Sequence, residues 1–260
     1  MSASPATLAR LRRRVAALER SGGGIVAPFG LAAVDDRLPW GGLPAACVHE
    51  VTGAGDTGAA TAFAAALAAR MARRRGRPVL WLAPRGPRGE TLYGAGLAAF
   101  GLDPADTLVV AASPADALWA LEEALRSPAI GAVVAELSGA IDLTASRRLQ
   151  LAAEAGGAAG LLLYAGSGTG ASACVTRWTV AGAESAPVAA VPDSVGAARW
   201  RVELVRCRGG RPASWLMEWT DDRSATTGGF ALAAPLSDRP DPAPRSVVAG
   251  DNVVPLALAG

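Results

Sequence analysis

The chain contains no lysine, so all 25 of its basic residues are arginine. It also has one histidine, three cysteines and few aromatic residues, which make up 5% of the composition. Cys47, Cys174 and Cys207 lie far apart and form no paired motif, so the sequence supports neither a zinc site nor a disulfide framework. The one histidine, His49, lies in an apolar run without a partnering nucleophile, and we expect it to be structural and not catalytic.

Long apolar runs are missing as well. The longest, near residues 59–69, is too short to span a membrane and is followed by arginines. No apolar segment follows the arginines at residues 10–14, so a signal-peptide pattern is absent. We therefore expect a cytoplasmic protein with no membrane association. A net charge of +2 does not by itself indicate a nucleic-acid binder.

The clearest motif is the frame of a phosphate-binding P-loop. Residues 53–58 place two glycines five positions apart, between an apolar run and an alanine-rich helix pattern. A working P-loop continues with Lys and then Ser or Thr, which hold the phosphates and Mg²⁺. Ala59 and Ala60 stand in those places, and Asp56 adds a negative charge to the loop. We therefore expect no catalysis, no cofactor and no metal at a vestigial loop comprising Gly53, Asp56, Gly58, Ala59 and Ala60.

Apolar strands alternate with helices along most of the chain, which indicates an α/β fold. We expect strands at 46–52, 78–83, 107–111, 130–137 and 160–164, and helices at 59–75, 90–100, 114–126 and 143–155. This alternation is typical of a mostly parallel sheet covered by helices on both faces. Strands at 174–180, 200–207 and 214–219 follow without helices, and the last two predict a C-terminal β-hairpin that extends the sheet.

The two ends of the chain differ from this core. Residues 5–20 predict an amphipathic helix, and residues 221–260 show no sustained periodicity. We therefore divide the chain into an N-terminal helix (1–24), a core domain (25–220) and a flexible C-terminal tail (221–260). Apolar residues at both ends either pack on the core or bind a partner. The partner-binding candidates are Leu8, Leu11, Val15, Leu18, Val253, Val254, Leu256 and Leu258.

Charged residues of the core offer few further candidates. Glu136 ends the strand at 130–137, where P-loop ATPases carry an Asp that orients Mg²⁺. Because Glu is longer and places its carboxylate differently, we expect a structural role for it at this vestigial acidic strand. Arginines at 70–77 and on the hairpin at 199–211 either form solvated surfaces or bind an acidic partner.

Several stretches resemble RecA-type recombinases. They are the Pro-Trp-Gly-Gly-Leu-Pro lead-in at 39–44, the His-Glu-Val run at 49–51, the strand at 130–137 and the closing hairpin at 201–219. The order of these features over residues 5–219 more closely resembles the ImuA family, the RecA-related member of the bacterial mutagenic translesion cassette. That family is also related to SulA-like division inhibitors. The resemblance implies a RecA-like P-loop core.

The sequence differs from RecA at positions that RecA uses for nucleotide and DNA, and these differences limit the activity that the resemblance implies. The Lys and Thr of the P-loop are absent, and Pro84-Arg85 replaces the catalytic Glu. The segments at 138–143 and 166–172 are short counterparts of the RecA DNA-binding loops. The resemblance thus implies a non-catalytic adaptor in SOS-induced, error-prone translesion synthesis after DNA damage. Its implied partners are an ImuB-like polymerase-related protein and an error-prone replicative-type polymerase, with RecA as a further candidate and DNA binding weak or indirect.

Two alternatives stay open from the sequence. The first is a SulA-like division inhibitor that binds a tubulin-like division protein. The second is an ATP-dependent DNA-binding enzyme with an altered loop, in which Asp56 or an arginine would replace the missing lysine. Arginine does not reproduce the compact point charge of lysine, which counts against the second alternative.

Overall fold

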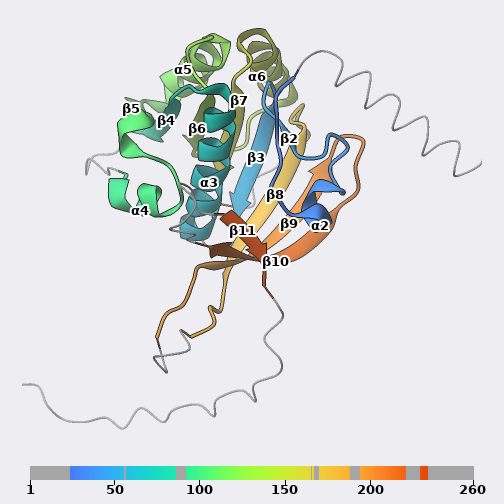
Figure 1. Ribbon diagram of the computed structural model, residues 1–260. Coiled ribbons are helices and arrows are strands. Elements are labelled where there is room, and N and C mark those ends of the chain that lie inside the picture. The colour runs from blue at the N-terminus through green and yellow to red at the C-terminus, as the bar shows by residue number, and fades with distance from the viewer. Residues whose placement is uncertain are drawn as a thin grey trace, which may run out of the picture.

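A nine-stranded sheet forms the centre of the computed structural model, which describes residues 24–55, 57–85, 92–164, 166, 170–187, 194–220 and 229–233. The strands follow the order β11-β10-β9-β8-β3-β7-β6-β4-β5 (Figure 1). The six strands from β8 to β5 run parallel to one another, and β9, β10 and β11 continue the sheet with antiparallel pairing. The predicted α/β class with a mostly parallel sheet is confirmed.

The elements lie close to their predicted positions. The sheet strands are β3 (Val48–Gly53), β4 (Val79–Pro84), β5 (Thr107–Ala112), β6 (Ala132–Leu137), β7 (Ala159–Tyr164), β8 (Thr176–Ala183), β9 (Arg199–Cys207), β10 (Ala213–Thr220) and β11 (Gly229–Leu232). The main helices are α3 (Thr57–Arg75), α4 (Gly94–Ala99), α5 (Pro114–Arg126) and α6 (Leu143–Gly156). Smaller elements are β1 (Val26–Ala27), α2 (Ala32–Asp35), β2 (Leu43–Pro44) and the 3₁₀ helix η1 (Pro104–Asp106).

Local capping explains why α5 and α6 begin where the sequence predicts. The Ser113 side chain accepts a hydrogen bond from the Asp116 backbone N–H at the start of α5. The Asp142 carboxylate accepts one from the Ala145 backbone N–H at 2.6 Å at the start of α6. Such side chains satisfy backbone donors that have no partner within the helix. At its other end α6 stops at Gly157, whose φ of 77° favours glycine.

Two hydrophobic clusters cover the two faces of the sheet. One contains most of the alanine-rich α3 together with α4, and the other contains α5 and α6 (Figure 1). Alternate residues of a strand enter different clusters: Val51 contacts the α3 side, whereas Val48 contacts the α5–α6 side. The predicted helices on both faces are therefore confirmed.

Aromatic side chains gather under the antiparallel strands on the α3 side. Trp200 and Trp219 are buried there, and Trp215 packs against the same cluster. Phe230 of β11 joins them, with its ring centroid 5.6 Å from that of Phe63 and 5.4 Å from that of Trp219. The prediction of a flexible tail from residue 221 is therefore wrong for 229–232, which form the edge strand. A single aromatic residue in so short a segment leaves no periodicity to detect.

The remaining terminal predictions lie outside the described residues. These are the helix at 5–20 and the apolar segment at 253–258, together with all eight partner-binding candidates. Among the helices that are described, none is long and apolar enough to cross a membrane.

Candidate functional site

The segment predicted to be a vestigial phosphate loop connects β3 to α3. Gly53 is the last residue of β3, and the helix begins at Thr57, so the loop leads directly from strand to helix. Gly55 has a φ of +82°, a conformation that L side chains rarely adopt. The Ala54 backbone N–H donates to the Val180 carbonyl at 3.0 Å, which ties the loop to β8. Gly58 lies in the first turn of α3, and Asp56 falls outside the described residues.

The two positions that carry Lys and Thr in a working loop face the core. Ala59 is 7% exposed and Ala60 is fully buried, and both belong to the hydrophobic cluster on the α3 side. Their methyl groups supply neither charge nor hydroxyl. What the loop still offers to an anion is the positive end of the α3 dipole and backbone N–H groups.

Glu136 lies at the carboxyl end of β6, with β7 between it and the loop-bearing β3. Its Oε1 accepts a hydrogen bond of 2.6 Å from Nε1 of Trp81, a fully buried side chain on β4. Among the described residues Glu136 forms no ion pair, and no group of three or more His, Cys, Asp or Glu is arranged to hold a metal. The contact with Trp81 joins neighbouring strands and supports the structural role expected for Glu136.

His49 is fully buried and hydrogen-bonded through both ring nitrogens. Its Nε2 lies 3.0 Å from the Pro44 carbonyl, which can only accept, so Nε2 carries the proton. Nδ1 then accepts from the Thr176 hydroxyl at 2.8 Å, and that hydroxyl accepts from Trp178 Nε1 at 2.8 Å. Burial lowers the pKa of His49 to about 4, partly opposed by the bond to Pro44. This network supports the expectation of a structural histidine.

Glu50 and Arg177 form a buried ion pair that the sequence analysis did not find. Arg177 Nε lies 2.6 Å from Glu50 Oε2, and their side chains are 14% and 2% exposed. The two residues are paired in the register of β3 and β8. Arg177 also donates to the Gly170 carbonyl at 2.9 Å. The available signal was one charged residue in each of two apolar strand patterns, with opposite signs. The pairing of β3 with β8, which brings the two residues together, cannot be derived from these local patterns.

The ion pair influences a cysteine and a tyrosine beside it. Burial and, to a smaller extent, the negative charge of Glu50 raise the pKa of Cys174 to about 12. Burial also raises the pKa of Tyr164, again with a smaller contribution from Glu50. Both groups are therefore neutral at physiological pH, and Cys174 has little thiolate character.

The arginines at the end of α3 mostly bind backbone carbonyls. Arg70 donates to the Pro28 carbonyl and lies over the ring of Phe230. Arg75 donates to the carbonyls of Gly156 and Gly157 at the end of α6, where a cation complements the helix dipole. These contacts favour a structural role for the arginines at 70–77 over the binding of an acidic partner. On the hairpin, Arg199 pairs with Glu218, whereas Arg201 is exposed.

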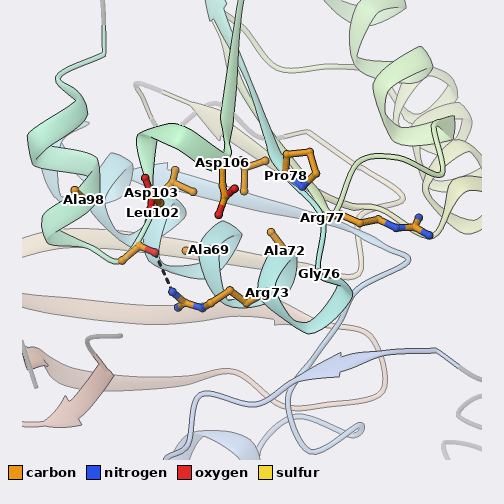
Figure 2. A pocket seen from close by; sticks show the side chains of 12 residues that line it. Ala69, Ala72, Arg73, Gly76, Arg77, Pro78, Ala98, Leu102, Asp103 and Asp106 are labelled. Carbon is orange, nitrogen blue, oxygen red and sulfur yellow. Dashed lines mark hydrogen bonds between the residues drawn. The ribbon is translucent and has the colours of Figure 1, made fainter. Parts of the chain in front are cut away.

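One cavity lies near the end of α3 that is opposite to the loop. It has a volume of 710 Å³ and is formed at the amino ends of β4 and β5 by α3, α4 and η1. Figure 2 shows Asp103 and Asp106 on its η1 side and Arg73 of α3, which donates to the Gly101 carbonyl at 3.0 Å. Acidic and basic side chains both line this cavity, so its charge does not indicate whether a ligand is an anion or a cation.

A second cavity, of 410 Å³, lies at the carboxyl ends of β4, β5 and β6. Glu136 lines it, together with the loop from Ser138 to Asp142 that leads into α6. No residue of the loop at 53–60 lines either cavity, within the residues that the structure describes. The loop at 53–60 and the two cavities are thus separate features of this fold.

The chain is an α/β protein with a mostly parallel sheet, and the first strand–loop–helix unit of that sheet has a Gly-x4-Gly loop followed by Ala59 and Ala60. No family model matches the chain. Protein ImuA of Caulobacter vibrioides, in each of two strains, is 42% identical to it over 210 residues, which cover 74% of this chain and 83% of that protein. The chain belongs to the ImuA family.

Proposed function

We propose that this chain is a cytoplasmic, non-catalytic accessory protein of SOS-induced, error-prone translesion DNA synthesis, built on a RecA-like P-loop core. The observation that carries the proposal is the 42% identity to Protein ImuA over 83% of that protein. Membership of this family points to mutagenesis and translesion synthesis. The alternative of a division inhibitor receives no support from the comparisons.

The state of the loop supports a role without nucleotide hydrolysis. Transfer of a phosphoryl group requires positive charge and a metal at the γ-phosphate. Ala59 and Ala60 supply neither, and their side chains are buried. Glu136, the candidate acidic residue, is hydrogen-bonded to Trp81. An adaptor needs the fold and its surface but not these groups.

The partners follow from the same proposal. We infer that the chain joins an ImuB-like polymerase-related protein to an error-prone replicative-type polymerase, with RecA as a third candidate. DNA contact is weak or indirect in this scheme. In support, Arg70, Arg73 and Arg75 are engaged by backbone carbonyls of the chain itself.

Complementation tests the role in mutagenesis. A strain that lacks the gene is treated with a DNA-damaging agent, and induced mutation frequency is measured with and without the wild-type chain. We expect mutagenesis to be lost and then restored, and co-purification to recover the ImuB-like protein and the polymerase after damage. Unchanged mutagenesis in the deletion strain contradicts the proposal.

A loop variant tests the non-catalytic part separately. Gly58→Asp places a carboxylate in the exposed first turn of α3, where it repels any nucleotide phosphate but suits the helix dipole. We expect this variant to complement fully, and purified wild-type protein to show no ATP hydrolysis above background. Hydrolysis by the wild type that Gly58→Asp abolishes would overturn this part while leaving the role in mutagenesis intact.

A further inference from the structure

The cavity of 410 Å³ lies at the topological switch point of the sheet. β4 and β6 are neighbours, but the chain leaves β4 towards α4 on the α3 side and leaves β6 towards α6 on the opposite side. In open α/β sheets this divergence opens a crevice outside the carboxyl ends of the strands, where ligands bind. The cavity therefore has the position of a binding site, independently of the phosphate loop.

The walls of this cavity are mainly apolar. β4 and β6 contribute Leu82 and Leu137, α5 contributes Ala117 and Leu118, and the loop before α6 contributes Ile141. Surfaces of this kind hold the methylene or ring portion of a ligand, and a few polar groups then orient it. The polar group at the end of β6 is Glu136.

The Glu136 carboxylate is oriented but not neutralised. Trp81 Nε1 binds Oε1, and Oε2 has no hydrogen-bond partner among the described residues. Arg85, the residue after β4, donates to the Ala111 carbonyl at 3.5 Å and forms no ion pair with a described carboxylate. A neutral indole donor fixes the carboxylate while leaving its charge available to a cation.

The two helix N-termini at the cavity do not offset the negative charge of Glu136. Asp142 caps α6, and Ser113 caps α5 and also donates to the Asp116 carboxylate at 2.6 Å. Each helix end is thus already matched by an acidic side chain of its own. Among the described residues that line the cavity, the charge left without a partner is the negative charge of Glu136.

An apolar strip on β5 leads towards the cavity. Leu108 and Val110 are 52% and 39% exposed, and they point to the same face as Ala112, which lines the cavity. β5 is the last strand of the sheet, and no described strand pairs with its outer edge. An open edge with exposed apolar side chains accepts an extended segment of another chain by β-strand addition.

We propose that this cavity receives an arginine side chain from an extended, apolar segment of a partner protein. The guanidinium binds Glu136, the methylene stem lies against the apolar walls, and neighbouring apolar residues of the segment cover Leu108 and Val110. Arginine suits the site better than lysine, because its planar fork donates to a carboxylate through two N–H groups. The inference rests on the proposed adaptor role, since it assigns the ligand to a partner protein.

A pair of isosteric peptides tests the inference on the full chain. The probes are acetylated, amidated Val-Val-Arg-Val-Val and the same peptide with citrulline, which keeps the shape but lacks the charge. We expect the arginine peptide to bind the wild type about tenfold more tightly by titration calorimetry, as a hydrogen-bonded charge implies. In Glu136→Gln, which retains an acceptor for Trp81, the two peptides should bind equally.

A steric variant completes the test. Ala117→Leu fills part of the cavity without changing charge, and it should weaken both peptides. Equal binding of the two peptides to the wild type, or unchanged selectivity in a folded Glu136→Gln protein, overturns the inference. Either result leaves the proposed function standing, because complementation by the wild type does not depend on the peptides.

Discussion

The parallel and antiparallel halves of the sheet are stabilised in different ways. β7, in the parallel half, is buried at all six positions, whereas β9, in the antiparallel half, alternates between buried Trp200, Val202 and Leu204 and exposed Arg201, Glu203 and Val205. Helices cover both faces of the central strands β3, β7 and β6, so small apolar residues suffice there. The antiparallel half is buried on one face only, and its few large aromatic residues provide that core.

This contrast shows where the scarce aromatic residues act. They make up 5% of the chain, yet eight of them meet in one cluster under β8 to β11. The cluster comprises Phe29, Phe63, Phe100, Trp178, Trp200, Trp215, Trp219 and Phe230. Removal of a buried ring from this cluster should therefore cost far more than removal of an exposed aromatic residue.

Trp200→Ala should give the largest effect. Trp200 is 3% exposed and contacts Phe63, Phe100, Trp219 and Phe230. We expect its replacement to lower the free energy of unfolding by about 4 kcal/mol, through lost burial and the cavity left behind. Chemical denaturation measures this change. The matched control is Trp119→Ala on α5, whose side chain is 67% exposed and whose loss should cost less than about 0.5 kcal/mol.

Glu50→Ala tests the ion pair between β3 and β8, the strand of the parallel half that borders the antiparallel half. It leaves Arg177 as an unpaired cation beside β3, and we expect a loss of about 3 kcal/mol in the free energy of unfolding. The double variant Glu50→Met/Arg177→Met removes both charges and should be more stable than the single variant. If the double variant is instead the less stable of the two, the ion pair is not the reason for the loss.

The histidine network predicts a pH dependence. His49 has a pKa of about 4 in the folded chain and about 6.5 when unfolded, so the unfolded state binds more protons between these values. Stability present above pH ~6.5 should therefore fall by about 3 kcal/mol as the pH drops to ~4. Denaturation at a series of pH values measures the slope, and the part due to His49 is the difference from His49→Gln. An equal slope in both proteins would exclude His49 as its source.

The sequence predicted the parallel half well, because its elements have local signals. Ser113 and Asp142 mark the starts of α5 and α6, and Gly157 marks an end. β11 was missed because Phe230 is held there by residues far away in the sequence, including Phe29 and Phe63.

The candidate site was predicted only in part, for a similar reason. The loop at 53–58 is contiguous in the chain, and its missing side chains can be read directly. The cavity at Glu136 is assembled from three strands and two helices, and the contact with Trp81 spans 55 positions. A single sequence shows an isolated carboxylate there and does not show which walls surround it.

The smallest predicted effect on stability comes from the loop at 53–58. It tests the backbone conformation of this loop separately from its side chains. Gly55 has a φ of +82°, and a Cβ added there would meet no heavy atom within 4 Å. Gly55→Ala should therefore cost about 1 kcal/mol, from backbone conformation alone. Gly139→Ala, in an equally open position without a positive φ, is the control and should change stability by less than about 0.5 kcal/mol. If both variants cost the same, Gly55 is not held in the left-handed conformation, and the loop does not keep the backbone of a phosphate-binding frame.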